Sequence, residues 1–447
     1  MKVLLVVHQF FPEVRDGTEV LTLELAHGLL RRGHRVEILT GALGEGEPSA
    51  APPWLTESVY EGITVHRLNY YESTCRDPIA LHSSAPARTE LVRRVVSQTE
   101  PEIVHINHFF GLSSEIIPAV RMLRTPVVYT ATDFWAICPQ ITLLHRFDNK
   151  VCDGPEGGLD CIRCCVNWFS RRSTRTAWIA KSLATTGAFR AHGTMRQVES
   201  LIRRPKSVAA HVNASNMIIS ATRFLADMLV RNGIDARLMR IIPYGVDIGK
   251  VGRRLEVPLC FTAAAPLRLA FMGAIAERKG PHIVLDALAA LGDRARAISL
   301  QLYGRGNPGD PYFREVRAKV ERLGGIAVLA GTFPHDRIGE VVTGHHLLVV
   351  PSLWYESTPL VLCSALAAGI PALVSRLGGM TEIVEEGTNG LSFTPGDAPA
   401  LKEVLLRLLD APEILAGLHR TTVARRRFTA DYVDDIESAY VQVRQGQ

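Results

Sequence analysis

The sequence predicts an α/β protein made of two domains, each built around a parallel β-sheet. Short apolar runs alternate with helical patterns in the first third of the chain, and the same alternation begins again near Leu267. A length of 447 residues suits two or three domains, and a hydrophobic fraction of 47% is enough for substantial cores. We therefore expect two separate sheets with helices between their strands.

The N-terminal segment predicts a βαβ unit. An apolar run at residues 3–7 predicts a strand, residues 18–32 carry apolar side chains at helical spacing up to Gly33, and residues 36–39 begin the next strand. Such a unit is typical of a Rossmann-like domain. The turn at residues 8–17 contains no G-x-G-x-x-G, which argues against a dinucleotide-dependent dehydrogenase.

Two further strands of this domain are expected at residues 103–106 and 127–130, and polar side chains gather near their ends. Ligands of parallel sheets bind at the carboxyl ends of the strands. Ordinary loop polarity is the simpler interpretation of these residues, and contact with an acceptor is the alternative. The polar side chains in question are His105, Asn107, His108, Thr132 and Asp133.

Neither a membrane span nor a signal peptide is expected. No run approaches the ~18 apolar residues that a spanning helix needs. Residues 1–14 contain one basic residue and a short apolar run but no small-residue cleavage site, which fits a first strand better than a signal peptide. We expect a cytoplasmic protein.

Two segments interrupt the alternation of strands and helices. Residues 44–57 are polar and contain proline and glycine, which predicts a surface loop or insertion. Residues 134–206 form a longer insertion that is rich first in cysteine and then in basic residues.

Five of the eight cysteines lie within 28 residues of the longer insertion. In a cytosolic protein such density is more typical of metal binding or catalysis than of disulfides. A structural zinc ion or an iron–sulfur cluster would use the same four thiolates, and several free buried thiols are the remaining interpretation. The four expected ligands are Cys138, Cys152, Cys161 and Cys164.

The basic part of the insertion, residues 163–206, carries ten Arg or Lys residues and a single acid, Glu199. Aromatic side chains such as Trp168 and Trp178 lie between these charges. The pattern suits peripheral contact with an anionic membrane or a phosphate-bearing acceptor such as a polyprenyl-diphosphate sugar, and a solvated helical face is the alternative. Nucleic acid is not expected, because no nucleic-acid motif accompanies the charge and the whole chain carries only +5.

The second half predicts another Rossmann-like sheet and a terminal helix. Its apolar runs are short and bounded by turn residues, as in buried parallel strands. The expected strands are residues 269–272, 298–303, 327–330, 347–350 and 373–375, and the expected helix is residues 431–443.

The segment after the strand at 347–350 has the features of a phosphate-binding helix start. Glu356 lies on the loop, Thr358 has the chemistry of an N-cap, and Pro359 suits the first helical position. The free amides of Leu360 and Val361 would then face a diphosphate, helped by the positive end of the helix dipole. A capped helix after a strand, without any ligand, is the alternative interpretation.

This segment resembles the retaining glycosyltransferases of family 4, which have the GT-B fold. Their motif is a Glu, seven residues, a second Glu, then a Gly-Gly turn and another Glu. Glu356 matches the first carboxylate, Gly378 and Gly379 match the turn, and Glu382 matches the last acid. The resemblance implies two Rossmann-like domains that face each other across a cleft. The second carboxylate, which grips the ribose in the family, is replaced here by Ser364.

The first loop of the second domain carries another part of the family signature. Gly273 and Lys279 match its glycine and its basic residue, while the Arg that normally follows the glycine is replaced by Ala274. Arg278 or Arg305 could supply that missing charge. The resemblance implies that Lys279 stabilises the diphosphate as the sugar leaves.

The N-terminal domain follows the family in outline. Gly17 matches the second glycine of a loop near the donor phosphates, where Asp16 stands in place of the first. Thr132 occupies the position of a histidine that usually lies near a strand end, and residues 241–247 resemble the crossing between domains, with Tyr244 in place of an Asn.

The resemblance implies a retaining transferase that moves a sugar from a UDP- or GDP-sugar to a glycan or lipid-linked acceptor, with no cofactor for catalysis. Envelope or exopolysaccharide assembly is the expected process. A non-catalytic or partner-activated protein, or a GT-B epimerase or phosphorylase, is the alternative. The expected domains are residues 1–245 on the acceptor side, residues 246–428 for the nucleotide sugar, and a helix at 429–447 that crosses back.

Overall fold

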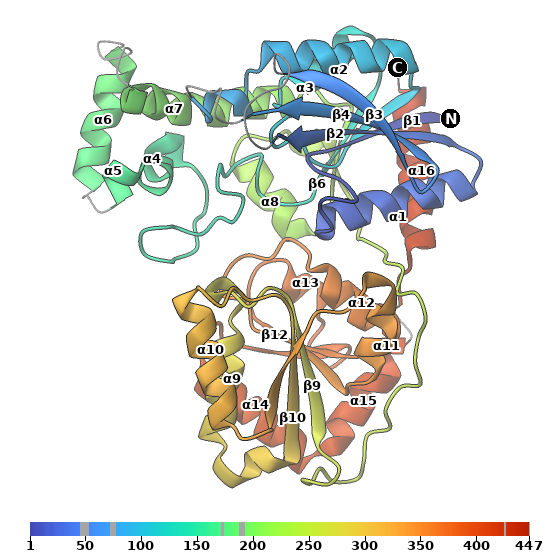
Figure 1. Ribbon diagram of the computed structural model, residues 1–447, viewed down its shortest axis with the longest axis vertical. Helices are drawn as coiled ribbons and strands as arrows, with labels where there is room; N and C mark the ends of the chain where they lie inside the picture. The colour runs from blue at the N-terminus through green and yellow to red at the C-terminus, as the bar shows by residue number, and fades with distance from the viewer. Residues whose placement is uncertain (45–52, 72–76, 171–173, 187–192, 424–425, 447) are drawn as a thin grey trace. The chain divides into compact units, whose positions relative to one another are not determined.

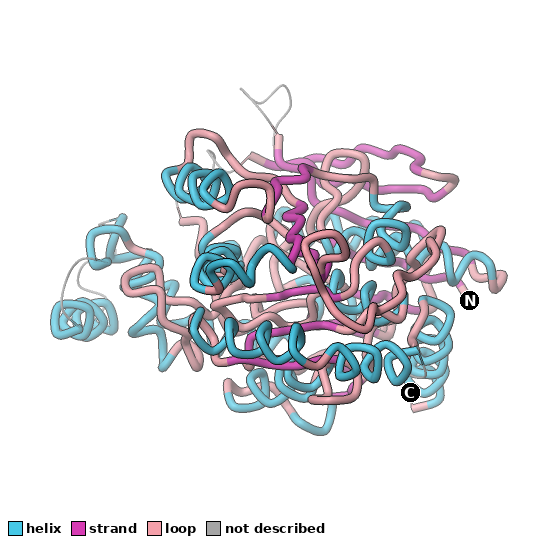
Figure 2. Tube along the Cα trace, turned by 90° about the horizontal axis from the view of Figure 1, so that it is seen from below, coloured by secondary structure: helices cyan, strands magenta, loops and turns pink. Residues whose placement is uncertain are grey.

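The computed structural model describes residues 1–447 except 45–52, 72–76, 171–173, 187–192, 424–425 and 447. The chain forms two compact units. The first unit comprises Met1–Pro243 and Tyr432–Gln447, and the second unit comprises Tyr244–Asp431. Helices and strands alternate along both units (Figures 1 and 2). The predicted α/β class with two Rossmann-like sheets is confirmed.

The sheet of the first unit has eight strands in the order β3-β4-β2-β1-β5-β6-β7-β8. Neighbouring strands are parallel, except that β3 and β4 form an antiparallel hairpin. The strands are β1 (Lys2–Val7), β2 (Arg35–Leu43), β3 (Trp54–Tyr60), β4 (Ile63–Tyr70), β5 (Ile103–Ile106), β6 (Val127–Ala131), β7 (Met217–Ser220) and β8 (Met239–Ile241).

The hairpin corrects one expectation from the sequence. The loop predicted for residues 44–57 ends before Trp54, because β3 starts there and pairs with β4. Residues 45–52 of that predicted loop lie outside the described part of the chain.

Five helices pack around this sheet, and the last of them comes from the C-terminus. They are α1 (Gly17–Arg31), α2 (Pro86–Thr99), α3 (Ile116–Met122), α8 (Arg223–Arg231) and α16 (Thr429–Gln445). Most of α16 belongs to the first unit. It approaches α1 so closely that a Cβ added to Gly28 would lie 2.4 Å from Val433 Cγ2. A small residue is therefore required where the two helices cross.

The insertion between β6 and β7 forms four helices, which lie to one side of the sheet strands in Figure 1. Ile162, Phe169, Ala177, Val198 and Leu201 are buried together, so this segment has a hydrophobic cluster of its own. The helices are α4 (Leu159–Cys165), α5 (Asn167–Ser170), α6 (Thr174–Thr186) and α7 (Gly193–Val212).

The sheet of the second unit is parallel throughout, with the strand order β11-β10-β9-β12-β13-β14. The strands are β9 (Leu267–Met272), β10 (Ile298–Tyr303), β11 (Ala327–Gly331), β12 (Leu347–Val350), β13 (Ala372–Ser375) and β14 (Gly390–Phe393). The helices are α9 (Pro281–Ala290), α10 (Pro311–Arg322), α11 (Ile338–Thr343), α12 (Leu360–Ala368), α13 (Met380–Ile383), α14 (Ala398–Asp410) and α15 (Pro412–Val423).

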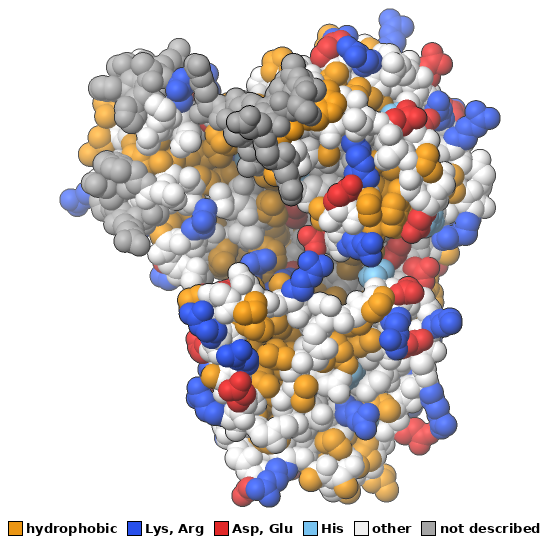
Figure 3. Space-filling model, in the orientation of Figure 1, with side chains coloured by type: hydrophobic (Ala, Val, Ile, Leu, Met, Phe, Trp, Pro, Cys, Tyr) orange, Lys and Arg blue, Asp and Glu red, His pale blue; other side chains and the backbone are white. Residues whose placement is uncertain are grey.

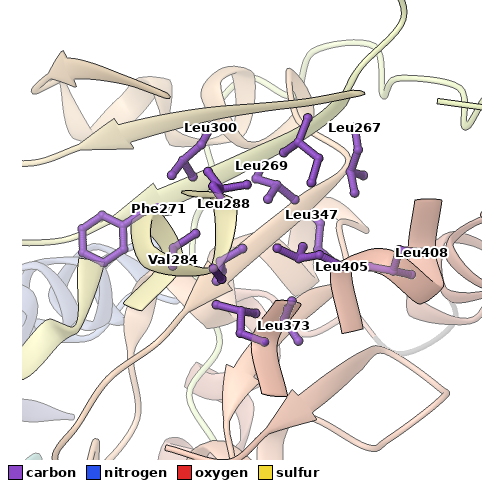
Figure 4. Close-up of a cluster of buried hydrophobic side chains, with 14 of the residues drawn as sticks. Leu267, Leu269, Phe271, Val284, Leu288, Leu300, Leu347, Leu373, Leu405 and Leu408 are labelled. Atoms are coloured by element: carbon purple, nitrogen blue, oxygen red, sulfur yellow. The ribbon is translucent and has the colours of Figure 1, made fainter. Parts of the chain in front are cut away.

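Leucines from neighbouring strands form the core of this sheet (Figure 4). Leu267 and Leu269 of β9, Leu300 of β10 and Leu347 of β12 are all 0% exposed. Each fully buried leucine contributes roughly 1.5–3 kcal/mol to folding. The strands are therefore held firmly, and the loops at their carboxyl ends start from fixed positions.

The surface carries both signs of charge. On the face drawn in Figure 3, blue Lys and Arg side chains and red Asp and Glu side chains are interspersed. Among the described residues, none of the helices is both long and apolar enough to cross a lipid bilayer.

Candidate functional site

Glu356 lies on the loop that leaves the buried strand β12, and its side chain is only 7% exposed. A single carboxylate oxygen, Oε1, accepts three hydrogen bonds. Lys279 Nζ donates at 2.7 Å, Ser352 Oγ at 2.7 Å and Trp354 Nε1 at 2.8 Å. The buried charge is thus paired and hydrogen-bonded, as burial requires.

Lys279 ends a short 3-10 turn after β9 and lies beside the ring of Trp354, with Nζ 5.2 Å from its centroid. Arg278 Cζ lies 5.5 Å from the same centroid. The next residue, Gly280, has φ +67°, and a Cβ there would lie 2.0 Å from the carbonyl oxygen of Pro351. Only glycine fits this close approach of two loops, which sets the position of Lys279.

Backbone hydrogen bonds join the loops after β9, β10 and β12. The amide of Leu353 donates to the carbonyl of Arg278 at 2.8 Å, and the amide of Ile275 donates to the carbonyl of Arg305 at 2.9 Å. The side chains of Arg278 and Arg305 are exposed. The structure therefore places both candidate arginines at the same edge of the sheet as Lys279.

The Gly-Gly turn also reaches Glu356. The amide of Gly379 donates to the carbonyl of Glu356 at 3.2 Å, and Gly378 has φ +61°. Glu382 follows on α13, is exposed, and donates its amide to the carbonyl of Gly379 at 3.2 Å. The spacing seen in the sequence thus corresponds to one connected set of loops.

The start of α12 differs from the expectation. Pro359 is the N-cap residue and Leu360 the first helical residue, while the hydroxyl of Thr358 donates to the carbonyl of Ser357. The predicted capping role of Thr358 is wrong, because its hydroxyl points back along the loop. The amides of Leu360 and Val361 still open the helix, where backbone amides lack partners within the helix.

Ser364 does not present its hydroxyl to a ligand. Its side chain is 1% exposed, and Oγ donates to the carbonyl of Leu360 at 2.9 Å, one turn earlier in the helix. A hydroxyl used in this way cannot stand in for a carboxylate that chelates a diol.

A second polar cluster lies in the first unit, at the carboxyl ends of β1, β5 and β6. His108 Nε2 lies 2.9 Å from Asp133 Oδ2, and the ring of His108 lies 4.2 Å from that of His8. His8 Nδ1 in turn lies 3.4 Å from Glu19 Oε1. Glu19 is 1% exposed, and its carboxylate oxygens accept no hydrogen bond from the described residues.

The protonation of this cluster follows from its burial. Burial raises the pKa of Glu19 to about 7 and lowers the pKa of His8 well below its ordinary value, with His108 adding to the second shift. Burial alone would raise the pKa of Asp133, but the charge and hydrogen bond of His108 lower it overall. Asp133 thus stays ionised, whereas Glu19 exchanges its proton near neutral pH.

Two other polar residues lie at these strand ends, His105 and Thr132. The structure contradicts the predicted acceptor contact of His105 and gives Thr132 a hydrogen bond within the protein. His105 is 0% exposed, and its ring nitrogens lie 2.7 Å from the hydroxyls of Tyr440 and Thr130. Burial lowers its pKa to about 3, so it is a neutral core residue and not an acceptor contact. The hydroxyl of Thr132 donates to the carbonyl of Asn107 at 3.2 Å.

Some residues of the two clusters were not expected from the sequence. His8 directly follows β1, so the rule that ligands bind at strand ends could have found it. Glu19 is an acid among the buried positions of α1, which is also a readable signal. No pattern in the sequence pointed to Trp354, because its contact with Glu356 depends on how the loop folds.

The predicted residue Gly17 begins α1 and is exposed.

The four predicted metal ligands line one pocket. Cys138, Cys152, Cys161 and Cys164 all face it, and they are not in disulfides. Burial raises the pKa of Cys152 to about 12 and that of Cys164 to about 11, so without a metal these are neutral thiols. Within the described ranges, no three His, Cys, Asp or Glu side chains converge closely enough to hold a metal ion.

Comparison with known families decides the identity of the chain. Residues 16–245 match the model described as a glycosyl transferase 4-like domain, and residues 266–411 match the model described as glycosyl transferases group 1. The chain belongs to the group 1 glycosyltransferases of family 4. It is therefore a nucleotide-sugar glycosyltransferase from a family that retains the anomeric configuration.

Similar proteins differ in what they make. Over 441 residues this glycosyltransferase is 23% identical to glycogen synthase of Mycobacterium tuberculosis H37Rv, covering 97% of this chain and 91% of that protein. It is 24% identical over 227 residues to the putative colanic acid biosynthesis glycosyltransferase WcaL of Escherichia coli K12, covering 48% of this chain and 53% of WcaL.

Solved structures share the fold of the glycosyltransferase. The Anabaena protein HepE in complex with UDP has a TM-score of 0.65 at 17% identity, covering 99% of this chain and 100% of that one. Sucrose-phosphate synthase from Thermosynechococcus elongatus has a TM-score of 0.65 at 18% identity, with 100% of both chains covered. Likeness at these identities shows the fold, which is GT-B, and not the substrate.

Proposed function

We propose that this glycosyltransferase transfers a hexosyl or related sugar from a UDP- or GDP-sugar, and that the second unit binds the donor. The observation that carries the proposal is the contact of Lys279 with Glu356 beside the start of α12. A cation, a carboxylate and free helix amides at one sheet edge suit a sugar diphosphate, since each group matches a different part of it.

Each group has a separate role in this proposal. Glu356 binds hydroxyls of the donor sugar, while Lys279 and the amides of Leu360 and Val361 hold the diphosphate. As the bond from the anomeric carbon to the phosphate oxygen breaks, negative charge builds on the diphosphate. Lys279 and an exposed arginine, Arg278 or Arg305, stabilise that charge, so the transfer step uses no catalytic metal.

Further donor contacts are assigned to the glycine loops. Gly273 and Gly304 let the backbone pass closely, since a Cβ on Gly304 would lie 1.8 Å from the carbonyl oxygen of Gly273. Glu382 and Gly17 are retained as donor-side residues on the family motif alone. Acceptor contact is assigned to His108 and Asp133, whose hydrogen bond fixes a polar pair at a strand end.

The acceptor proposed is a lipid-linked or envelope polysaccharide precursor, reached from the cytoplasmic face of a membrane. Helix α6 exposes Trp178 (61%), Ile179 (52%) and Leu183 (41%). Arg175 and Lys181 lie on the same helix. Exposed apolar side chains beside basic ones suit an anionic lipid surface. The name of the partly similar protein WcaL, which refers to colanic acid, supports a polysaccharide product.

Membrane contact is tested by co-sedimentation with vesicles. The full chain is expected to sediment with vesicles rich in anionic lipid and much less with neutral ones. Trp178→Ser should weaken binding severalfold, whereas Trp54→Ser on β3 should not. Equal binding of wild type to both kinds of vesicle, or none, would overturn this part of the proposal.

A partner-activated transferase is the second candidate, and Ser364 favours it. Its hydroxyl is already bonded inside α12, so nothing at that position grips the ribose as the family carboxylate does. Such a protein would bind nucleotide weakly and turn over slowly without a partner.

The deciding experiment is a panel of UDP- and GDP-sugars incubated with lipid and sugar acceptors, read as nucleotide release. Turnover that falls with Lys279→Ala and persists in the exposed-lysine variant Lys250→Ala would support the transferase. Binding of a nucleotide sugar by calorimetry without turnover would favour the partner-activated form. Neither binding nor turnover across the panel would overturn both.

A further inference from the structure

A buried carboxylate in the first unit lacks the partners that burial normally requires. Glu19 of α1 is 1% exposed, and neither of its carboxylate oxygens accepts a hydrogen bond from a described residue. His8 Nδ1 lies 3.4 Å from Glu19 Oε1 and is likewise enclosed without a hydrogen-bond partner. Buried polar groups without partners cost free energy, so they call for an explanation. The Glu19–His8 pair therefore indicates a role beyond packing.

His8 is the member of this pair that a ligand can reach. It directly follows β1, at the edge of the sheet where ligands of parallel sheets bind. Its side chain is 19% exposed, compared with 1% for Glu19 and 3% for His108. Nδ1 is enclosed, whereas Nε2 is not, and no described residue forms a hydrogen bond with Nε2. The imidazole thus has one nitrogen beside a buried acid and the other open to a ligand.

The neighbouring pair of His108 and Asp133 has no nitrogen to offer. His108 Nδ1 accepts a hydrogen bond from the amide of Phe110 at 3.1 Å, so the ring proton lies on Nε2, 2.9 Å from Asp133 Oδ2. Asp133 Oδ1 accepts from the amide of Trp135 at 2.7 Å. Both nitrogens of His108 are therefore occupied, and its ring packs 4.2 Å from that of His8. The pair supports the ring of His8 and leaves the free nitrogen to His8.

The surroundings of the Glu19–His8 pair decide which of the two groups titrates. Burial raises the pKa of Glu19 to about 7; the charge of Asp16 adds to this shift, and that of His108 opposes it. Burial also lowers the pKa of His8 well below its ordinary value; His108 adds to this shift, and Asp133 opposes it. His8 therefore stays neutral near pH 7, while Glu19 gains and loses its proton there.

The proton on Glu19 determines what His8 Nε2 presents to a ligand. Ionised Glu19 accepts a hydrogen bond from Nδ1–H, so Nε2 keeps a lone pair and accepts. Protonated Glu19 donates to Nδ1, so the ring proton lies on Nε2, which then donates. A small rotation of either side chain aligns the two groups, and contacts of this kind often tighten only when a ligand binds.

An accepting Nε2 suits the hydroxyl of a sugar acceptor. A hydroxyl that donates its proton to Nε2 keeps its own lone pairs free to attack the anomeric carbon. A hydroxyl that accepts from Nε2–H has one lone pair already engaged. The tautomer that ionised Glu19 enforces is therefore the one that orients a hydroxyl for reaction.

We propose that His8 Nε2 accepts a hydrogen bond from the reacting hydroxyl of the acceptor, and that Glu19 is a positioning residue that keeps the ring proton of His8 on Nδ1. This inference rests on the proposed function, because it names a further acceptor contact of the same reaction. His8 adds to His108 and Asp133 a nitrogen that is free to accept. Its task is to bind the hydroxyl and to orient it.

Steady-state kinetics of the full chain test the contact with the acceptor. His8→Phe keeps a ring but loses both nitrogens, so the KM for the acceptor should rise about tenfold while the KM for the donor stays unchanged. His8→Gln keeps an oxygen that can accept and should recover part of the loss. The matched control is His27→Phe, since His27 Nε2 also lies 3.4 Å from a carboxylate oxygen, Glu61 Oε2. An unchanged acceptor KM in both His8 variants, or a raised donor KM instead, would overturn the contact.

The pH profile tests the positioning role of Glu19. In the wild type, kcat/KM for the acceptor should fall as the pH falls through about 7, because protonated Glu19 moves the ring proton of His8 to Nε2. Glu19→Gln cannot titrate and should lose this step, whereas the control Glu61→Gln should keep it. A purely structural role would lower kcat/KM equally at every pH. The same step in Glu19→Gln as in the wild type would contradict the positioning role.

Nitrogen NMR of the histidine rings separates this inference from the proposed function, because it needs no turnover. In the full chain with labelled histidine, the signals of His8 are assigned by their loss in His8→Gln. They should show Nδ1–H above pH 7 and Nε2–H below it. Turnover without this change of tautomer would overturn the inference alone. The change of tautomer without turnover of any donor would overturn the proposed function, and the acceptor contact with it, while the exchange of a proton between Glu19 and His8 would stand.

Discussion

Two polar clusters lie at strand ends, one in each unit, and they balance charge in opposite ways. In the second unit, Glu356 meets Lys279 and two further donors, so its charge is compensated inside the protein. In the first unit, Glu19 is as deeply buried, but its neighbour is His8, whose pKa is lowered by the same burial. Glu356, which has a cation beside it, remains available to bind hydroxyl groups. Glu19, which has no cation beside it among the described residues, exchanges its proton near neutral pH.

The difference suggests separate tasks. A compensated pair that is 7% and 24% exposed can open toward a donor and exchange one partner for another. A buried carboxylate that has no cation beside it lowers the stability of the fold when it ionises. Such a carboxylate is suited to respond to pH or to an incoming charged group. Variants that remove one group from each cluster test whether the two clusters have different roles.

The largest effect is expected from Lys279→Ala. Removing the cation that we propose faces the diphosphate should lower kcat by about 10²- to 10³-fold, the loss typical for one preorganised charge-stabilising group. Steady-state kinetics with saturating donor measure it. The control Lys250→Ala changes an exposed lysine of the same unit and should stay near wild type. A loss of less than about threefold in Lys279→Ala would remove Lys279 from the mechanism.

Glu19→Gln should change how stability depends on pH. The pKa of Glu19 rises from 4.5 to about 7 in the folded protein. Between these values the folded state keeps a proton that the unfolded chain has lost, so rising pH lowers the free energy of unfolding, by about 3 kcal/mol in all. The glutamine variant cannot titrate and escapes this loss.

Denaturant unfolding at pH 5 and pH 8 provides the measurement. Relative to wild type, Glu19→Gln should gain roughly 2–3 kcal/mol between the two pH values. Glu24→Gln on the same helix is the matched control, because Glu24 is only half-buried, and it should gain little. A pH-independent difference between Glu19→Gln and wild type would show that Glu19 does not titrate in this window.

Trp354→Phe tests the third donor to Glu356. The indole Nε1 donates to Oε1 at 2.8 Å, and a hydrogen bond to a charged group contributes about 1.5–3 kcal/mol. We expect kcat/KM to fall about tenfold, since phenylalanine keeps the ring but loses the N–H. Trp54→Phe in the first unit serves as the control. Wild-type kinetics for Trp354→Phe would mean that two donors suffice to position Glu356.

The smallest effect is expected from Ser364→Ala. Because the hydroxyl is bonded to the carbonyl of Leu360, its removal should change the KM for donor by less than about twofold. Thr343→Ala is a matched control, since its hydroxyl donates in the same way to the carbonyl of Gly339 at 2.7 Å. A tenfold rise in KM for Ser364→Ala alone would show that Ser364 turns toward the nucleotide after all.

Much of the fold could be predicted because its signals are local. The strands at residues 103–106 and 347–350 have the predicted bounds, since each is a short run buried on both faces. The strand at 298–303 also has the predicted bounds, and its buried and half-buried residues alternate. The hairpin strand Trp54–Tyr60 was missed, because its alternating polar residues resemble a loop until the pairing with β4 is known.

Some features of the candidate site could likewise be predicted from the sequence, and others could not. Glu356, Lys279 and the Gly-Gly turn were identified from their resemblance to the family motifs, and the structure joins them through hydrogen bonds. The direction of a side chain was not predictable. Thr358 turns back to the loop, and His105 is bonded between Thr130 and Tyr440, a residue 335 positions away.

The sequence by itself determined the two parallel sheets, the family and the residue types at the donor-side loops, because periodicity and motif spacing are properties of neighbouring residues. Only the tertiary structure decided which groups share a hydrogen bond or a pocket. The pairing of Glu356 with Lys279 and the lining of one pocket by four cysteines depend on segments far apart in the chain. Charge compensation is a property of those long-range contacts, and so is the chemistry that follows from it.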